Sequence, residues 1–252
     1  MAIIGMGLLG LLIGGMINAL ADSLPVDKKV HLPECHSCGA PRPWFAWFGL
    51  LGLVVGGRTC VYCGIRRGIR AGVVEIVASL GTIWIFTTQP SPARIASSIL
   101  VSAIFLLIAV IDLERRLILH VVSLPAAIII GLLGILSPSP GALRTLAGGA
   151  VGFIAVLGLF LLGEAFTNAV NRLRGRPLDE VAFGFGDVNL AGLIGLAVGW
   201  PGVVAALLVG MLAAGLFSLG YLIVMFLRRS YSAFTPIPYG PFLIIGAFLV
   251  YF

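Results

Sequence analysis

The chain has 252 residues, of which 60% are hydrophobic and only 10% are charged, and its mean hydropathy is +1.12. Because a soluble domain carries about 25% charged residues, this composition excludes an ordinary soluble globular protein. It predicts an integral membrane protein.

Apolar runs near or above the roughly 18 residues that cross a bilayer recur along the chain. We predict eight membrane-spanning helices, at 2–20, 71–88, 93–111, 118–136, 142–163, 187–199, 202–227 and 238–252. The sixth is short and ends at a Gly-Trp-Pro-Gly run, 199–202, where glycine and proline interrupt a helix. One helix over 187–227 would be far too long, so the pattern favours two. The predicted fold class is an all-α polytopic membrane protein with about eight transmembrane helices.

The distribution of Lys and Arg predicts the orientation. If the first helix runs from outside to inside, all 16 Lys and Arg residues except Arg94 and Arg144 fall in cytoplasmic loops, as the positive-inside rule requires. Both termini are then outside. The formal charge of +6 mostly reflects this bias. The basic loops also suit anionic lipid, whereas nothing in the sequence supports a nucleic-acid site.

The sizeable soluble segment is 21–70, which we expect to form a small cytoplasmic domain between the first helix, 1–20, and a membrane core, 71–252. It contains two Cys-x-x-Cys knuckles, and its four cysteines are Cys35, Cys38, Cys60 and Cys63. Four thiolates suit tetrahedral zinc. A pair of disulfides is the competing interpretation, but cytosolic thiols stay reduced. A site of four thiolates leaves no open position for water, so we expect a structural metal.

Two details of the knuckles bear on this prediction. Gly39 and Gly64 each follow a second cysteine, where a turn that wraps backbone around a metal needs a small residue. His36 is an alternative ligand, but four thiols are already available.

Two aspartates are predicted to reach the cytoplasmic membrane face. Asp112 ends the third span, and Asp187 begins the sixth, behind Gly184 and Gly186 in "FGFGDVNL". Two carboxyls that share a site do not both ionise cheaply, so one activates water while the other donates a proton to a scissile carbonyl. The two glycines would let an extended peptide approach the carboxyl closely.

Each aspartate also has a structural interpretation. Asp112 precedes Arg115 and Arg116 by three and four residues and suits an interfacial salt bridge. Asp187 suits a helix N-cap, because Asp is favoured there and glycines precede it. Spacing alone does not show that the carboxyls meet.

These residues resemble the bacterial type IV prepilin peptidases, which are membrane aspartic peptidases of the GxGD kind. The resemblance is carried by "IDLERRLIL", "GFGDVNL" and the paired knuckles, and by three further stretches: "GGMINALADSLP" (14–25), "GIRAGVVEIVASL" (68–80) with Glu75, and "IPYGPFLIIGAF" (237–248). It covers most of the chain. The chain departs from the family after the first aspartate, where it has "RLILHVV" with His120 in place of the common Ile-Pro.

The resemblance implies an enzyme of the bacterial inner membrane. Such enzymes cut the short basic leader from prepilins and pseudopilins on the cytoplasmic side, and many then methylate the new N-terminus with S-adenosylmethionine. Asp112 and Asp187 match the family's catalytic aspartates, and Cys35, Cys38, Cys60 and Cys63 match its zinc ligands. The resemblance leaves open whether this chain methylates.

Two other classes of function fit parts of the sequence. Intramembrane carboxylates also mark ion or proton pathways, so a transporter is one alternative, although no inverted repeat is evident. A non-enzymatic assembly factor of a pilus or secretion machine, with the zinc loop as its docking module, is the other.

Overall fold

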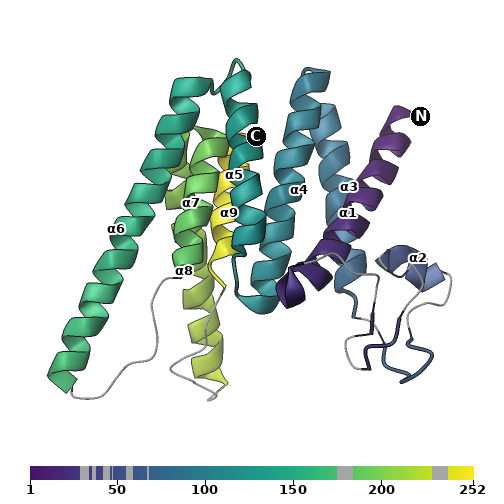
Figure 1. Ribbon diagram of the computed structural model, residues 1–252, viewed down its shortest axis with the longest axis horizontal. Coiled ribbons are helices and arrows are strands. Elements are labelled where there is room, and N and C mark those ends of the chain that lie inside the picture. The colour runs from purple at the N-terminus through teal and green to yellow at the C-terminus, as the bar shows by residue number, and fades with distance from the viewer. Residues whose placement is uncertain are drawn as a thin grey trace. The chain divides into compact units, whose positions relative to one another are not determined.

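The computed structural model describes residues 1–28, 34–35, 38–41, 46, 48–54, 59–66, 68–174, 184–228 and 238–252. The described part of the chain is helical, with isolated bridges in place of strands (Figure 1). Its helices are α1 (Ala2–Asp27), α2 (Gly49–Val54), α3 (Arg70–Thr88), α4 (Pro92–Arg115), α5 (His120–Leu136), α6 (Ala142–Arg174), α7 (Phe185–Val198), α8 (Gly202–Leu227) and α9 (Gly240–Tyr251).

Each predicted span corresponds to one helix, with shifted ends. Within the described part of the chain, five helices are long and apolar enough to cross a membrane, namely α1, α3, α4, α6 and α8. The other three are shorter, and the 14 residues of α7 cover about 21 Å of a hydrocarbon core of about 30 Å. The fold is that of a polytopic membrane protein, while the count of eight spans stays a prediction for α5, α7 and α9.

Helix ends account for the differences. We expected the first helix to end at residue 20, but α1 continues through Pro25 to Asp27. We expected the fifth to end at residue 163, but α6 continues to Arg174. The predicted break in 187–227 is confirmed, since α7 ends at Val198 and Gly199 has a positive φ of 69°.

The chain divides into two compact units, 1–111 and 112–252, which are described separately. In the first, α1 packs closely on α3. A Cβ on Gly10 would lie 2.5 Å from the Cα of Ser79, and one on Gly14 would lie 2.6 Å from the Cα of Glu75. Such close backbone approach through small residues is how helices associate within a bilayer.

A buried polar cluster lies where α1, α3 and α2 meet. Glu75 is only 1% exposed and accepts hydrogen bonds from the backbone N–H groups of Gly49 and Leu50, the first two residues of α2. The Asn18 amide donates to Glu75 over 3.4 Å and to the carbonyl of Ala71 over 3.0 Å. Glu75 therefore joins α2 to the helix pair.

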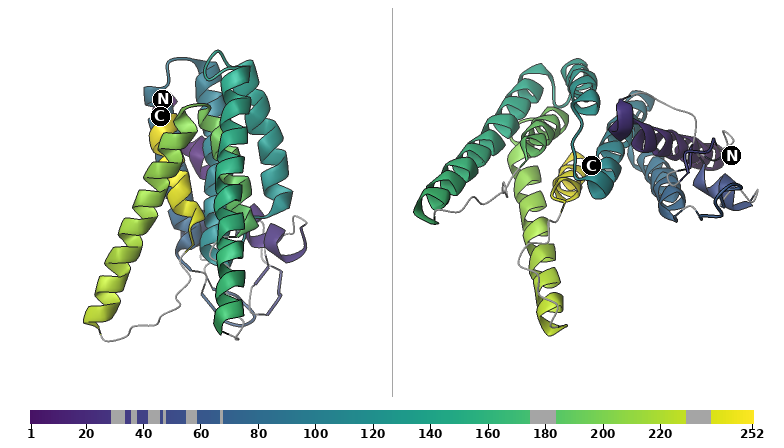
Figure 2. Two further views of the ribbon diagram at one scale, coloured as in Figure 1. Left: turned by 90° about the vertical axis from the view of Figure 1, so that its left-hand side faces the viewer. Right: turned by 60° about the horizontal axis from the view of Figure 1, so that its bottom comes forward.

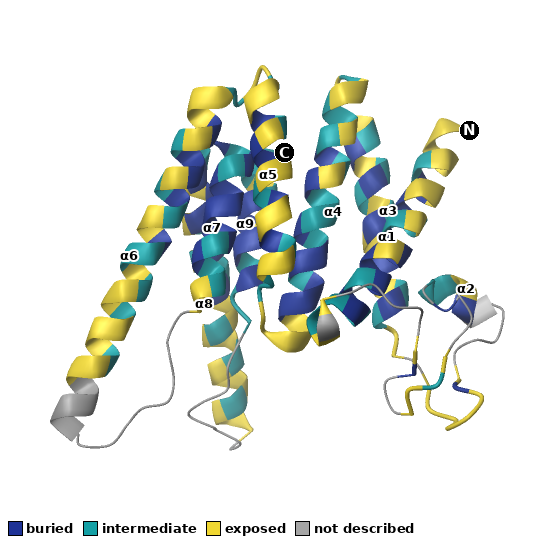
Figure 3. Ribbon diagram, in the orientation of Figure 1, coloured by how far each residue is buried: buried dark blue, intermediate teal, exposed yellow. Residues whose placement is uncertain are grey.

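In the second unit, α7 is the central helix and contacts α5, α6, α8 and α9. Figure 3 shows it as largely buried, whereas α6 and α8 expose one side along their length. The exposed fractions of Val188, Ala191 and Ile194 are 0%. In the views of Figure 2, α6 and α8 extend past the start of α7 and diverge there. Because four helices surround α7, its buried part is a fixed base for the functional group in its first turn, where Phe185 is 45% exposed.

Candidate active site and metal centre

Asp112 lies in the last turn of α4 and is 6% exposed. The backbone N–H of Gly240, at the start of α9, donates to its Oδ2 over 3.1 Å. A Cβ on Gly240 would lie 2.6 Å from the same oxygen. Gly240 therefore both binds the carboxyl and makes room for it, a role that sequence analysis did not assign. In the sequence, Gly240 was noted only as part of "IPYGPFLIIGAF", one of the stretches that carry the family resemblance.

Asp187 lies in the first turn of α7, where the N-cap residue is Gly184. Its Oδ2 accepts a hydrogen bond from the Gly184 N–H over 3.3 Å, and its own N–H donates to the Gly184 carbonyl over 3.0 Å. The interpretation of Asp187 as the N-cap residue itself was wrong. It is the third helical residue and reaches back to the cap, where a carboxylate also suits the helix dipole.

The two aspartates lie at one end of the second unit, close enough for their carboxyls to interact electrostatically. In each, the hydrogen bond to the backbone engages Oδ2. Among the described residues, neither Arg115 nor Arg116 forms an ion pair with Asp112, so the salt-bridge interpretation of that residue has no support.

The chain between α4 and α5 runs along the start of α7. Ile118 lies against Gly186, where an added Cβ would be 2.9 Å from the Cβ of Ile118. The absence of a side chain at Gly186 is thus needed for this packing. Gly184 has ordinary space around its missing Cβ. Whether either glycine also admits a peptide, as the sequence suggested, stays a prediction.

His120, the first residue of α5, also contacts α7. Its ring stacks on Phe185 with centroids 6.3 Å apart and an interplanar angle of 11°. Its Nε2 lies 3.3 Å from the side-chain nitrogen of Asn189. Sequence analysis assigned no chemistry to either His120 or Asn189, because the contact joins residues 69 positions apart.

The two cysteine knuckles have the same backbone geometry. In the first, the N–H of Gly39 donates to the carbonyl of Cys35 over 2.8 Å, and in the second the N–H of Gly64 donates to the carbonyl of Cys60 over 2.9 Å. Both glycines have positive φ, 66° and 71°, which glycine adopts without steric cost. No atom lies within 4 Å of where either Cβ would be, so the positive φ, and not the small size that the sequence suggested, is what favours glycine here.

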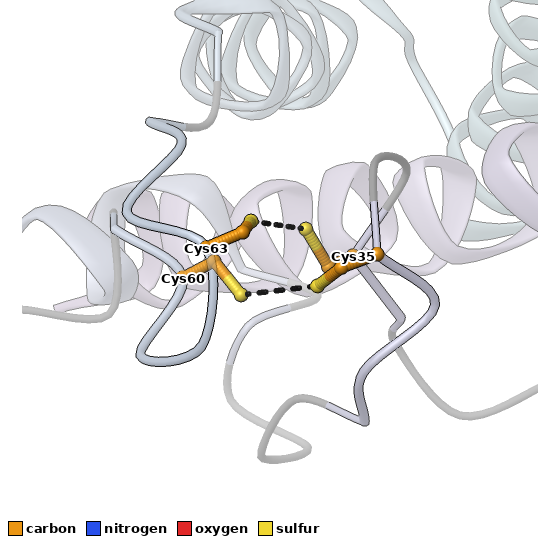
Figure 4. A group of neighbouring side chains, drawn as sticks. Cys35, Cys60 and Cys63 are labelled. Atoms are coloured by element: carbon orange, nitrogen blue, oxygen red, sulfur yellow. Dashed lines mark hydrogen bonds between the residues drawn. The ribbon is translucent and has the colours of Figure 1, made fainter.

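The knuckles bring four sulfur atoms together in the first unit. The Sγ atoms of Cys35, Cys38, Cys60 and Cys63 all lie within 4.8 Å of one another. Two sulfur pairs join the knuckles, Cys35 with Cys63 at 3.6 Å and Cys38 with Cys60 at 3.7 Å. Figure 4 shows the side chain of Cys35 pointing toward those of Cys60 and Cys63. Zinc bound tetrahedrally with Zn–S distances of about 2.3 Å would require Sγ atoms about 3.8 Å apart. The donor set and its spacing therefore fit a closed zinc site.

None of the four cysteines forms a disulfide. Backbone N–H groups of Cys63 and Tyr62 lower the pKa of Cys60. The N–H of Ile65 acts the same way on Cys63, but burial and the neighbouring thiols outweigh it and raise the pKa of Cys63 to about 12. The cluster thus holds protons that a metal would displace. His36 lies outside the described residues.

Comparison with known proteins assigns both sites to one family. A sequence model described as "Bacterial Peptidase A24 N-terminal domain" matches residues 8–89, which include all four cysteines. The model of the "Type IV leader peptidase family" matches residues 99–219, which include both aspartates. The chain belongs to the type IV leader peptidase family. The family resemblance inferred from the sequence is confirmed.

Curated relatives align along nearly the whole chain. Proteins named "Prepilin leader peptidase/N-methyltransferase" are 22% identical in Aeromonas salmonicida (strain A449), 23% in Pseudomonas aeruginosa and 27% in Pectobacterium carotovorum subsp. carotovorum. Each alignment covers 96% of this chain, and it covers 87%, 87% and 89% of the respective relative. No solved structure matches the chain.

Proposed function

We propose that this leader peptidase cleaves the basic leader of type IV prepilins or pseudopilins, with Asp112 and Asp187 as its catalytic pair. The observation that carries the proposal is their arrangement. Two carboxyls from different helices interact at one end of the second unit, and a backbone N–H group holds Oδ2 of each.

This arrangement suits general acid–base hydrolysis of a peptide bond. Close carboxyls share a proton, because ionising both is costly. The ionised member takes a proton from water, which attacks the scissile carbonyl carbon. The protonated member donates to the carbonyl oxygen as it becomes tetrahedral. As the tetrahedral intermediate collapses and its C–N bond breaks, the first aspartate gives the proton taken from water to the leaving amine. The second aspartate regains a proton from the hydroxyl of the intermediate, which restores the starting state of the pair.

The charge distribution supports cleavage on the cytoplasmic face. With both termini outside, the ends of α4 and of α7 that carry the aspartates face the cytoplasm, where a leader would be presented. The same orientation puts the cysteine knuckles in a reducing compartment. We therefore propose the bacterial inner membrane as its location, with structural zinc bound by Cys35, Cys38, Cys60 and Cys63.

Methyl transfer is the second proposed activity. The relatives carry "N-methyltransferase" in their names and align over 96% of this chain, which includes the first unit. In this proposal S-adenosylmethionine supplies the methyl group to the amine that cleavage has exposed. The residues that bind it are left unassigned.

The test is a cleavage assay with purified full-length chain in lipid, a model prepilin and labelled S-adenosylmethionine. We expect wild type to release the leader, seen as the mass of the product, and Asp112→Asn and Asp187→Asn to release none. Glu164→Gln, at an exposed acid of α6, is the matched control and should cleave normally. Ion flux in liposomes without cleavage would instead favour a transporter, and label on the product would establish methylation.

A further inference from the structure

We propose that His120 is a positioning residue of the peptidase reaction, which holds the first turn of α7 so that Asp187 faces Asp112. The inference depends on the proposed role of the two aspartates as the catalytic pair. It concerns the segment 116–120, which we name the α4–α5 bridge.

The α4–α5 bridge begins four residues after Asp112 and ends at His120, which contacts the helix of Asp187. Arg116 follows the last residue of α4 in the left-handed region, with φ of 54°, and its N–H donates to the carbonyl of Asp112 over 2.8 Å. Two residues later, Ile118 lies against Gly186. The N–H of Ser123 donates to the carbonyl of Leu119 over 2.9 Å and starts α5. Both ends of the bridge are therefore anchored.

His120 is the polar contact of this bridge. It stacks on Phe185 and bonds to Asn189, which lie two residues before and two residues after Asp187. On the other side of Phe185, the ring of Phe160 in α6 makes an edge contact with centroids 6.1 Å apart. Phe185 is thus held between an imidazole and a phenyl ring.

The helical period explains why His120 acts through α7 rather than on the substrate. Residues four apart lie on one face of a helix, so Phe185 and Asn189 share the face of α7 that His120 contacts. Asp187 lies two positions from each of them and therefore points away from that face. Without this contact the first turn of α7, which is less buried than the rest of the helix, can roll. A roll of about 10° moves a side-chain atom about 6 Å from the helix axis by about 1 Å, and a misplacement of that size can cost about a hundredfold in rate.

The experiment measures kcat and KM for prepilin cleavage in wild type, His120→Ala, His120→Gln, Asn189→Ala and the double Ala variant. We expect kcat to fall ten- to hundredfold in both single Ala variants, with KM within twofold. The double variant should be no slower than either single one, since both lose one contact. His120→Gln should recover most of the rate, because its side-chain oxygen accepts from the Asn189 amide.

Val121→Ala is the control, because Val121 is a neighbour in the first turn of α5 and is 41% exposed; it should keep wild-type kinetics. If His120→Ala does not fold, Asn189→Ala and His120→Gln carry the test. The proposal is overturned if the losses in kcat of His120→Ala and Asn189→Ala multiply in the double variant. It is also overturned if these variants change KM alone, or if all of them keep the wild-type rate. Asp112→Asn is assayed in parallel. If it still cleaves, the proposed catalytic pair is wrong. If it is inactive while His120→Ala has normal kinetics, only the proposed positioning role of His120 is wrong.

Discussion

Replacing Gly240 with alanine tests the contact between α9 and Asp112. The new methyl carbon would lie 2.6 Å from Oδ2 of Asp112, 3.2 Å from its Cγ and 3.4 Å from Cδ2 of Leu190. An ordinary contact begins near 3.4 Å, so the oxygen must move by about 0.8 Å, the difference between 2.6 Å and 3.4 Å. Because Asp112 is 6% exposed, the carboxyl has little room to move, and the hydrogen bond to the Gly240 N–H would stretch.

We expect two measurable effects of Gly240→Ala. A displacement near 1 Å at a reacting group predicts a loss of about a hundredfold in kcat. Overpacking of a buried site costs about 1–3 kcal/mol, partly offset because alanine favours a helix over glycine by about 1 kcal/mol. The assays are prepilin cleavage kinetics and thermal unfolding in detergent.

Gly215→Ala, on the neighbouring helix α8, is the matched control. A Cβ there would have no atom within 4 Å, so the same substitution adds a methyl group without overpacking. We expect it to keep wild-type kcat without lowering the melting temperature. A Gly240→Ala protein with wild-type kcat and stability would refute the placement of α9 against Asp112.

The remaining predictions concern the first unit. Cys35→Ser should reduce bound zinc from about one ion per chain to almost none, measured by elemental analysis, while lowering cleavage less than Asp112→Asn does; full zinc retention would contradict the four-thiolate site. Glu75→Leu should destabilise the chain by about 1–3 kcal/mol, because the N–H groups that begin α2 lose a buried acceptor. We expect a protease to cut the segment 28–69 faster in Glu75→Leu than in wild type. Ile76→Ala, at an exposed neighbouring residue, is the control, and unchanged protease sensitivity of Glu75→Leu would contradict the prediction.

The order of helices was predictable because lipid imposes long apolar runs, and glycine and proline mark their breaks. The break at Gly199 and the short sixth helix were found this way. Helix ends were not predictable, because polar residues such as Arg174 and Asp27 continue a helix beyond the apolar run. The packing of Gly10 and Gly14 on α3 was also missed, since apolar patterns do not show which glycines meet a neighbouring helix.

The candidate residues themselves were found because their chemistry is unusual in its setting. Purely structural roles seldom explain four cysteines at the spacing of two Cys-x-x-Cys knuckles, or an aspartate beside an apolar helix. Their supports were missed because they are contacts between distant positions: Gly240 with Asp112 is separated by 128 residues, and Asn189 with His120 by 69. The sequence immediately around Gly240 or Asn189 does not indicate that either residue contacts a distant functional residue.

The most direct test of the catalytic pair is the single-turnover rate of prepilin cleavage by Asp112→Asn, Asp187→Asn and the double variant, each confirmed to be folded. Residues that act as one unit give non-additive losses. The account predicts that each single variant loses nearly as much rate as the double variant. A single variant that cleaves at the wild-type rate, or two partial losses that multiply in the double variant, would contradict it.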